Sequence, residues 1–229
     1  MARRPAFLLV ASGRLHLRLA ALLVAALFAA GCGGGDDEAT TQSAPPGCTP
    51  VERPEPREPE TRQPPSVELD ADVRYTAVVQ TNCGEFTITL VPQRSPRATA
   101  SFAALAEDGY FDDTTFHRIV PGFVIQGGDP TASGTGGPGY TTVDPPADNT
   151  TYTNGTVAMA KTEAEPPGAA GSQFFVVVSD EVALPPDYAV IGEVNSGFDS
   201  VARIGAFGDA SGVPTFTVVV DSIEISRED

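Results

Sequence analysis

"FHRIVPGFVIQGGDP", residues 116–130, decides the fold of this chain. Apolar residues on both sides of the Pro-Gly turn predict two short strands. Arg118 and Gln126 stand among these apolar residues. Burying an arginine without a partner is costly. Arg118 therefore either forms an ion pair within the fold or faces a cleft in which it acts.

On both sides of this stretch, most segments have the alternating apolar pattern of β-strands, and few have the pattern of a helix. Eight runs predict strands: 73–81, 84–91, 114–120, 123–128, 155–161, 173–179, 188–195 and 215–226. Two helices are predicted, at 95–110 and 196–207, and loops are predicted at 129–154 and 162–172. Strands that follow one another without helical crossovers favour a mainly β fold, an antiparallel barrel with helices over its ends.

The two predicted helices have recognisable boundaries and apolar faces. In the first, Ser95 is expected to cap the helix, Pro96 to occupy the first helical position and Gly109 to end it. Its apolar face contains Phe102, Leu105 and Ala106. The apolar face of the second helix contains Phe198, Val201 and Ile204.

The N-terminus has the features of a targeting signal. Basic residues precede an apolar run, 19–30, which is short for a membrane span. The run ends in "AAGC", which resembles a bacterial lipobox, so residues 1–32 are predicted to be a lipoprotein signal peptide with Cys32 as the lipidated residue. An ordinary secretory peptide and a short anchor are the alternatives. Either reading places the remaining chain outside the cytoplasm.

Residues 33–66 are predicted to be a disordered tether, since they are rich in Gly, Pro and charge. Residues 67–229 form the predicted domain, with 7 Lys and Arg against 23 Asp and Glu, so the net charge of −16 lies there. Such a surface repels phosphate backbones and excludes nucleic acid as an expected partner. Outside the cytoplasm, Cys48 and Cys83 are predicted to pair as a disulfide, with two free thiols as the alternative.

Five motifs occur in order within the domain: the opening stretch, "GTGGPGY" (134–140), "GTVAMA" (155–160), "GSQFFV" (171–176) and "YAVIGEV" (188–194). Together they resemble the cyclophilin-type peptidyl-prolyl cis-trans isomerases, over residues 74 to 226. The resemblance implies a closed eight-stranded antiparallel barrel capped by two α-helices. It also implies that neither a cofactor nor a metal is needed.

The resemblance assigns roles to single residues. Arg118 is expected to donate a hydrogen bond to the prolyl nitrogen of a twisted amide, and Gln126 to orient Arg118 and bind substrate backbone. His117 is interpreted as a hydrogen-bonded structural residue rather than a catalytic base, and Phe174 as core. The expected substrate-binding residues are Phe123, Val124, Ala160, Lys161, Gln173, Phe175, Leu184 and Tyr188.

Three positions depart from the pattern of the family. Ala183 replaces a frequent tryptophan, which implies weak inhibition by cyclosporin, Tyr188 replaces a histidine and Lys161 replaces an asparagine. Because Arg118 is retained, we expect activity to survive. The competing hypothesis is a binding module or holdase that captures proline-containing segments without turnover.

The partners expected from the sequence are proline-containing segments of unfolded or exported proteins. The predicted location is the outer face of the bacterial cell membrane, with the N-terminal lipid as the only attachment to the membrane. A monomer is expected.

Overall fold

The computed structural model describes residues 44–180 and 182–228. The predicted signal peptide, with Cys32, and residues 33–43 of the predicted tether lie outside the described residues. The first two strands form the predicted hairpin: β1 (Arg74–Thr81) pairs antiparallel with β2 (Phe86–Leu90). Most positions of β1 alternate between buried and partly exposed, so one face of the hairpin points into the core.

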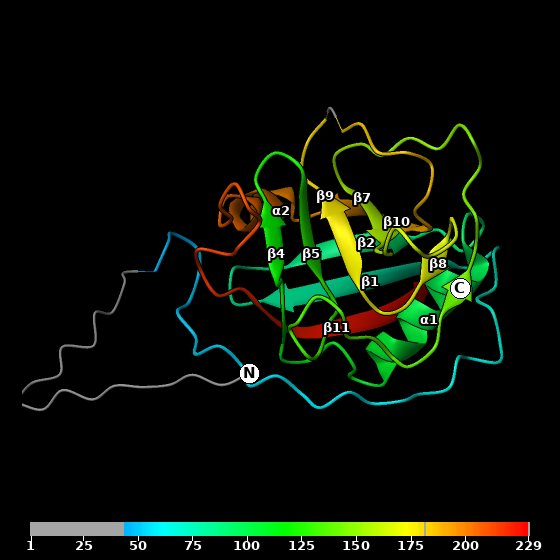
Figure 1. The fold of residues 1–229 in the computed structure, drawn as a ribbon, viewed down its shortest axis with the longest axis horizontal. Coiled ribbons are helices and arrows are strands. Elements are labelled where there is room, and N and C mark those ends of the chain that lie inside the picture. The colour runs from blue at the N-terminus through cyan, green and yellow to red at the C-terminus, as the bar shows by residue number, and fades with distance from the viewer. Residues whose placement is uncertain (1–43, 181, 229) are drawn as a thin grey trace, which may run out of the picture. The chain divides into compact units, whose positions relative to one another are not determined.

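Nine strands form one sheet in the order β3-β11-β1-β2-β10-β7-β9-β5-β4, and every pair is antiparallel. The remaining strands are β3 (Thr114–Thr115), β4 (Arg118–Val120), β5 (Val124–Gly127), β7 (Thr156–Met159), β9 (Phe174–Val177), β10 (Val190–Ser196) and β11 (Val219–Glu228). The sheet curls, and α1 (Pro96–Glu107) and α2 (Phe198–Gly205) lie towards opposite ends of it (Figure 1).

The mainly β class with two helices is confirmed, but the strand pairing differs from a closed barrel of eight strands. The order of nine strands ends at β3 and β4, which gives a half-barrel. The extra strand arises because the predicted strand 114–120 is split at Phe116 and His117. Phe116 turns into the core, 1% exposed, and its N–H donates to the carbonyl of Val218.

Two further short strands lie in segments that the sequence predicts to be loops. β6 (Thr142–Val143) and β8 (Ala169–Ala170) pair with each other as a separate two-stranded sheet. Their residues are far apart in the chain, so local composition alone does not reveal the pairing.

Both helices form at the predicted positions, but two of the predicted details, the cap of α1 and the buried face of α2, differ. Ser95 is the N-cap residue of α1, yet its side chain makes no capping bond. The Ala98 N–H donates instead to Asp144 Oδ2 at 2.7 Å, so a distant carboxylate satisfies the helix end. On α2, Val201 and Ile204 are buried as predicted, whereas Phe198, the first residue of the helix, is 44% exposed.

The main core is built around Phe174, which packs as predicted and is 0% exposed. The Phe102 and Phe174 rings meet edge to face with centroids 5.4 Å apart, a favoured aromatic geometry. A second cluster of buried residues lies on the other side of the sheet and contains Val124, Tyr152, Ala158, Phe175, Val177 and Val190. One face of β5 and β9 therefore packs against the main core, and the other face is available to form a pocket.

Residues 44–66, called the strap below, lie against the domain although the sequence predicts a disordered tether there. The strap contains no helix or strand. Cys48 and Cys83 form a disulfide, and the Thr49 N–H donates to the carbonyl of Asn82 at 2.7 Å. A covalent link of this kind keeps the following residues within reach of the domain, which favours further contacts. Among the described residues, no helix is both long and apolar enough to cross a membrane.

Candidate active site

A row of three polar side chains crosses β4, β5 and the start of β9. Arg118 and Gln126 are paired residues of β4 and β5, so their side chains emerge on the same face. Arg118 Nη1 donates to Gln126 Oε1 at 3.4 Å, and Gln126 Nε2 donates to Gln173 Oε1 at 3.0 Å. Arg118 also lies over the Phe123 ring, 5.9 Å from its centroid. The row holds a guanidinium in place without neutralising it.

No carboxylate of the described residues forms an ion pair with Arg118. The alternative of a structural ion pair therefore lacks a partner in the described part of the chain. Arg118 is partly exposed. The cost of burying an unpaired arginine is thus avoided, because the guanidinium borders a cleft.

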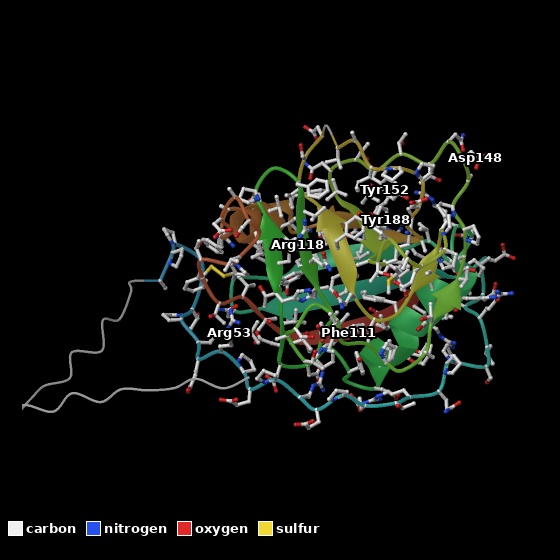
Figure 2. All side chains as sticks on the ribbon, in the orientation of Figure 1. Arg53, Phe111, Arg118, Asp148, Tyr152 and Tyr188 are labelled. Carbon is white, nitrogen blue, oxygen red and sulfur yellow. A yellow bond between two sulfur atoms is a disulfide. The ribbon has the colours of Figure 1, made fainter. Side chains whose placement is uncertain are left out.

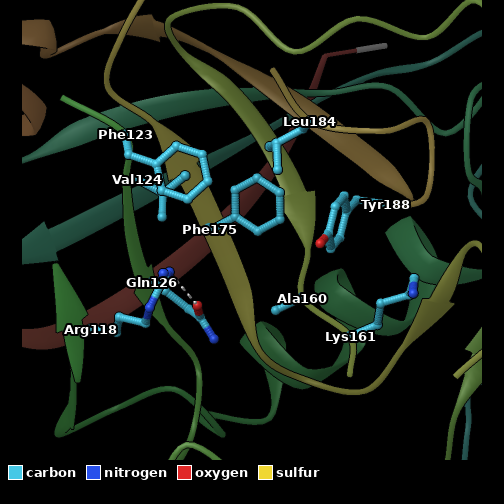
Figure 3. A pocket seen from close by; sticks show the side chains of 9 residues that line it. All are labelled: Arg118, Phe123, Val124, Gln126, Ala160, Lys161, Phe175, Leu184 and Tyr188. Carbon is cyan, nitrogen blue, oxygen red and sulfur yellow. Dashed lines mark hydrogen bonds between the residues drawn. The ribbon is translucent and has the colours of Figure 1, made fainter. Parts of the chain in front are cut away.

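The cleft is a pocket of ≈ 240 Å³. Figure 3 shows Phe175 in its centre, with Arg118 and Gln126 on one side and Tyr188 on the other. Nine residues line it: Arg118, Phe123, Val124, Gln126, Ala160, Lys161, Phe175, Leu184 and Tyr188. All nine are among the ten substrate-contacting or catalytic positions expected from the sequence. The tenth, Gln173, lies behind Gln126 and contacts it.

Phe175 and Tyr188 form the apolar wall of the pocket. Phe175 pairs with Gln126 on β5 and with Ala158 on β7, which fixes it between two strands. Its ring meets the Tyr188 ring edge to face, with centroids 5.3 Å apart. Phe175 is buried among its neighbours and contributes its ring to the lining of the pocket.

Tyr152 is a site residue that the sequence reasoning missed. Its hydroxyl donates to the Tyr188 carbonyl at 2.9 Å and accepts from the Tyr188 N–H at 2.9 Å. Figure 2 shows both tyrosines on the same side of the molecule. Burial raises the pKa of Tyr152, so it stays protonated and able to donate. The only signal in the sequence was one aromatic residue within a polar loop.

Lys161 and Ala160 follow β7 at the edge of the pocket. The Lys161 side chain is 6% exposed, and its Nζ donates to the carbonyls of Thr162 and Glu165, each at 3.2 Å. Asp187 Oδ2 lies 3.8 Å from Nζ. The lysine is thus satisfied by the protein, and it offers its aliphatic stem to the pocket.

His117 is not hydrogen-bonded as the sequence interpretation expected. Both ring nitrogens are inaccessible to solvent and have no partner among the described residues. Burial lowers the pKa of His117, while Asp129 and contacts with Gln173 and the Thr115 backbone, which fall short of hydrogen-bond geometry, oppose the shift. The neighbouring Arg118 lowers the pKa further. The imidazole is therefore neutral at pH 7 and does not line the pocket, which argues against a role as base.

The loop that contains Gly136 contacts the row of polar side chains at Gln173. The sequence did not indicate this contact. Gln173 Nε2 donates to the carbonyl of Gly136 at 3.0 Å. Gly136 is held in turn by Asp129, 0% exposed, whose carboxylate accepts from the N–H groups of Thr131, Gly134 and Gly136. Burial opposes ionisation of Asp129, but these hydrogen bonds hold its pKa below the ordinary value.

The site thus combines an apolar pocket with a guanidinium held by a row of polar side chains. Within residues 44–180 and 182–228, no cluster of His, Cys, Asp or Glu is arranged to hold a metal ion. The fold and the site define a class of β-sheet domain whose pocket places an apolar wall beside a cationic hydrogen-bond donor.

The family model of the cyclophilin-type peptidyl-prolyl cis-trans isomerases matches residues 76–225. The chain belongs to this family. It is 41% identical over 111 residues to the peptidyl-prolyl cis-trans isomerase B of Bacillus subtilis, a match that covers 48% of this chain and 76% of that protein. It is 35% identical over 145 residues to an isomerase of Arabidopsis thaliana, covering 62% of this chain but only 28% of that longer protein.

The fold agrees with a solved structure of a cyclophilin-type peptidyl-prolyl cis-trans isomerase of Cryptosporidium parvum. The TM-score is 0.62 at 30% identity, and the match covers 68% of this chain and 99% of that one. The same protein solved in the presence of the dipeptide Ala-Pro gives a TM-score of 0.60 at 30% identity, over 66% of this chain and 98% of that one.

Proposed function

We propose that the chain is a peptidyl-prolyl cis-trans isomerase that acts on proline-containing segments of exported proteins, with Arg118 as its catalytic residue. The observation behind the proposal is a guanidinium free of carboxylate partners in the described structure, at the edge of the apolar pocket. Membership of the isomerase family and the Ala-Pro dipeptide present with the Cryptosporidium relative support the choice of substrate.

The mechanism follows from the chemistry of the amide. Rotation about an X-Pro bond has a barrier of about 18–20 kcal/mol, because twisting removes amide resonance. In the twisted state the prolyl nitrogen becomes pyramidal and gains a lone pair. Arg118 donates a hydrogen bond to that lone pair, which does not exist in the planar ground state, so the interaction favours the transition state selectively.

The other pocket residues hold the substrate while the bond rotates. Phe175 and its aromatic and aliphatic neighbours enclose the proline ring, and Gln126 keeps the guanidinium directed at the ring nitrogen. Ala160 and Lys161 offer backbone groups to the residues before the proline. Rotation then needs no nucleophile and no proton transfer, consistent with a neutral His117 outside the pocket.

The test is the cis-to-trans rate of a short X-Pro peptide with the full chain and with its Arg118→Ala variant. Loss of a preorganised donor should lower kcat/KM by about a hundredfold or more. Arg203→Ala is a control, since Arg203 donates to the Cys83 carbonyl away from the pocket. An unchanged rate in Arg118→Ala would refute the mechanism. Peptide binding without any acceleration by the native chain would favour a proline-binding module.

The cellular setting is part of the proposal. We infer that Cys32 is lipidated and that the domain works at the outer face of the bacterial cell membrane. The disulfide between Cys48 and Cys83 supports a compartment outside the cytoplasm, where such bonds persist. Cys32→Ser should move the protein from the membrane fraction to the soluble fraction, and a variant that still sediments with membranes would contradict the inference.

A further inference from the structure

The strap is fixed to the domain at its beginning. Besides the disulfide, the Thr49 carbonyl accepts from Asn82 Nδ2 at 2.9 Å. The Asn82 side chain is also bonded to β11, because its Oδ1 accepts from the Val219 N–H at 2.9 Å. The first part of the strap is therefore joined to the sheet by both covalent and polar links.

Further along, two arginines of the strap bind Tyr110, which follows α1. The guanidinium carbons of Arg57 and Arg62 lie 5.6 Å and 5.2 Å from the centroid of the Tyr110 ring. Arg57 Nη2 also donates to the Tyr110 carbonyl, and Arg62 forms an ion pair of 3.1 Å with Asp108. Two cations over one buried aromatic ring stabilise a defined position of the strap.

The same two residues hold the loop that completes the active site. The backbone N–H of Arg57 donates to the Pro130 carbonyl at 2.9 Å, and that of Arg62 to the Pro138 carbonyl at 2.8 Å. Between these two prolines lies Gly136, the acceptor for Gln173. The strap is thus bonded to both ends of the segment 130–138. This segment is rich in glycine and would otherwise have a wide choice of conformations.

A second route leads from Tyr110 to the same residue. Ser172 Oγ lies 3.4 Å from the Tyr110 hydroxyl and donates to the Gly128 carbonyl at 2.6 Å. Ser172 directly precedes Gln173 in the chain. The strap therefore reaches Gln173 through the loop and through the tyrosine.

We propose that the strap is a positioning element of the active site, with Arg57 and Arg62 as positioning residues. They fix the loop 130–138 and Tyr110, these fix Gln173, and Gln173 fixes Gln126 against Arg118. This inference rests on the proposed function of Arg118. The match to the family model begins at residue 76, so the strap lies outside the matched region.

The experiment uses the full chain with the double substitution Arg57→Ala and Arg62→Ala. Misplacement of the guanidinium should lower kcat about tenfold while KM changes little, since Arg118 acts in the transition state. Arg57→Lys with Arg62→Lys keeps the cations over Tyr110 and should recover most of the rate. Arg53→Ala is the matched control, an exposed arginine of the same strap, and should leave kcat unchanged.

A second readout separates positioning from a loss of stability. The side-chain amide resonances of Gln173 report its bond to Gly136, and they should shift in the double alanine variant at a temperature where it remains folded. If that variant unfolds, the single substitution Arg62→Ala replaces it, because this side chain is 27% exposed.

Unchanged kcat, or reduced kcat with unshifted Gln173 resonances, would overturn the proposal. If Arg118→Ala itself kept the native rate, the proposed function would fail. The Gln173 resonances would still decide whether the strap holds the loop.

Discussion

At the scale of single residues, the pocket depends on side chains that are fixed by groups outside it. Tyr188 is held by the Tyr152 hydroxyl, and Arg118 by Gln126 and then Gln173. The contacts of Tyr152 with Tyr188 and of Gln126 with Gln173 join residues far apart in the chain, whereas Arg118 and Gln126 face each other on neighbouring strands. The resemblance to the family predicted all nine lining residues, together with Gln173, because their types and order are characteristic of the family. No local pattern indicated Tyr152, which supports Tyr188 from outside the pocket.

Tyr152→Phe should weaken substrate binding with little effect on the chemical step. The variant loses both hydrogen bonds to the Tyr188 backbone, which should cost about 1 kcal/mol of stability and let the Tyr188 ring move. Steady-state kinetics should show a higher KM at nearly constant kcat. Tyr140→Phe is a control that loses one hydroxyl contact, to Ser101. Equal KM values in native protein and Tyr152→Phe would show that Tyr188 needs no support.

His117 should make stability depend on pH. Its folded pKa lies below the ordinary 6.5, so the unfolded chain binds the proton more tightly. Its contribution to stability is complete above pH 6.5 and is lost as the pH falls towards the lowered folded pKa. Urea unfolding at pH 8 and pH 5 should therefore show a smaller decrease for His117→Gln than for the native chain. An equal decrease in both would exclude His117 as the source.

At the scale of elements, the loop 129–138 connects the described strap to the polar row. The sequence predicted a loop here from its glycines and prolines, and this was correct. What it could not indicate was the direction of the Asp129 carboxylate, which turns inward and bonds the backbone of its own loop. The same holds for Asp144 at the start of α1. At α1 the Asp144 side chain thus takes the place of the Ser95 cap that the sequence predicted.

Asp129→Asn should loosen this loop and slow catalysis. An amide retains one acceptor oxygen where the carboxylate has two, so buried N–H groups lose partners at a cost of about 1–3 kcal/mol. Hydrogen exchange at Gly134 and Gly136 should quicken, and kcat should fall. Asp144→Asn, a second buried acid that bonds backbone, should lower stability without lowering kcat. A similar kcat loss in both variants would point to general destabilisation.

At the scale of the described domain, the antiparallel sheet and the two helices could be predicted from alternation and turn residues. The number of strands and the ends of the sheet could not, because the predicted strand 114–120 is interrupted at Phe116 and His117, which no local pattern indicates. The strap was expected to be a tether, since its composition cannot form a core of its own. Its position depends on the disulfide, which the sequence predicted, and on contacts with Tyr110, which it did not.

Removing the disulfide should lower the stability of the domain. Cys48 and Cys83 are 35 residues apart, and closing a loop of this size contributes about 4 kcal/mol in the chain-entropy model. The variant Cys48→Ser with Cys83→Ser should therefore unfold at a lower urea concentration than the oxidised native chain. The reduced native chain should resemble the variant. Identical midpoints for oxidised and reduced protein would show that strap contacts alone maintain the stability.

The disulfide also determines where a mechanical load would enter the protein. A pull transmitted through the residues before Cys48 passes across the sulfur–sulfur bond to Cys83, between β1 and β2, and bypasses the chain between the two cysteines. The strap residues that follow Cys48 are then shielded from tension. In a stretching experiment the oxidised protein would extend less than the reduced one, by about 120 Å for a 35-residue separation. Tension applied to the proposed N-terminal attachment would then leave the active-site loop unstrained.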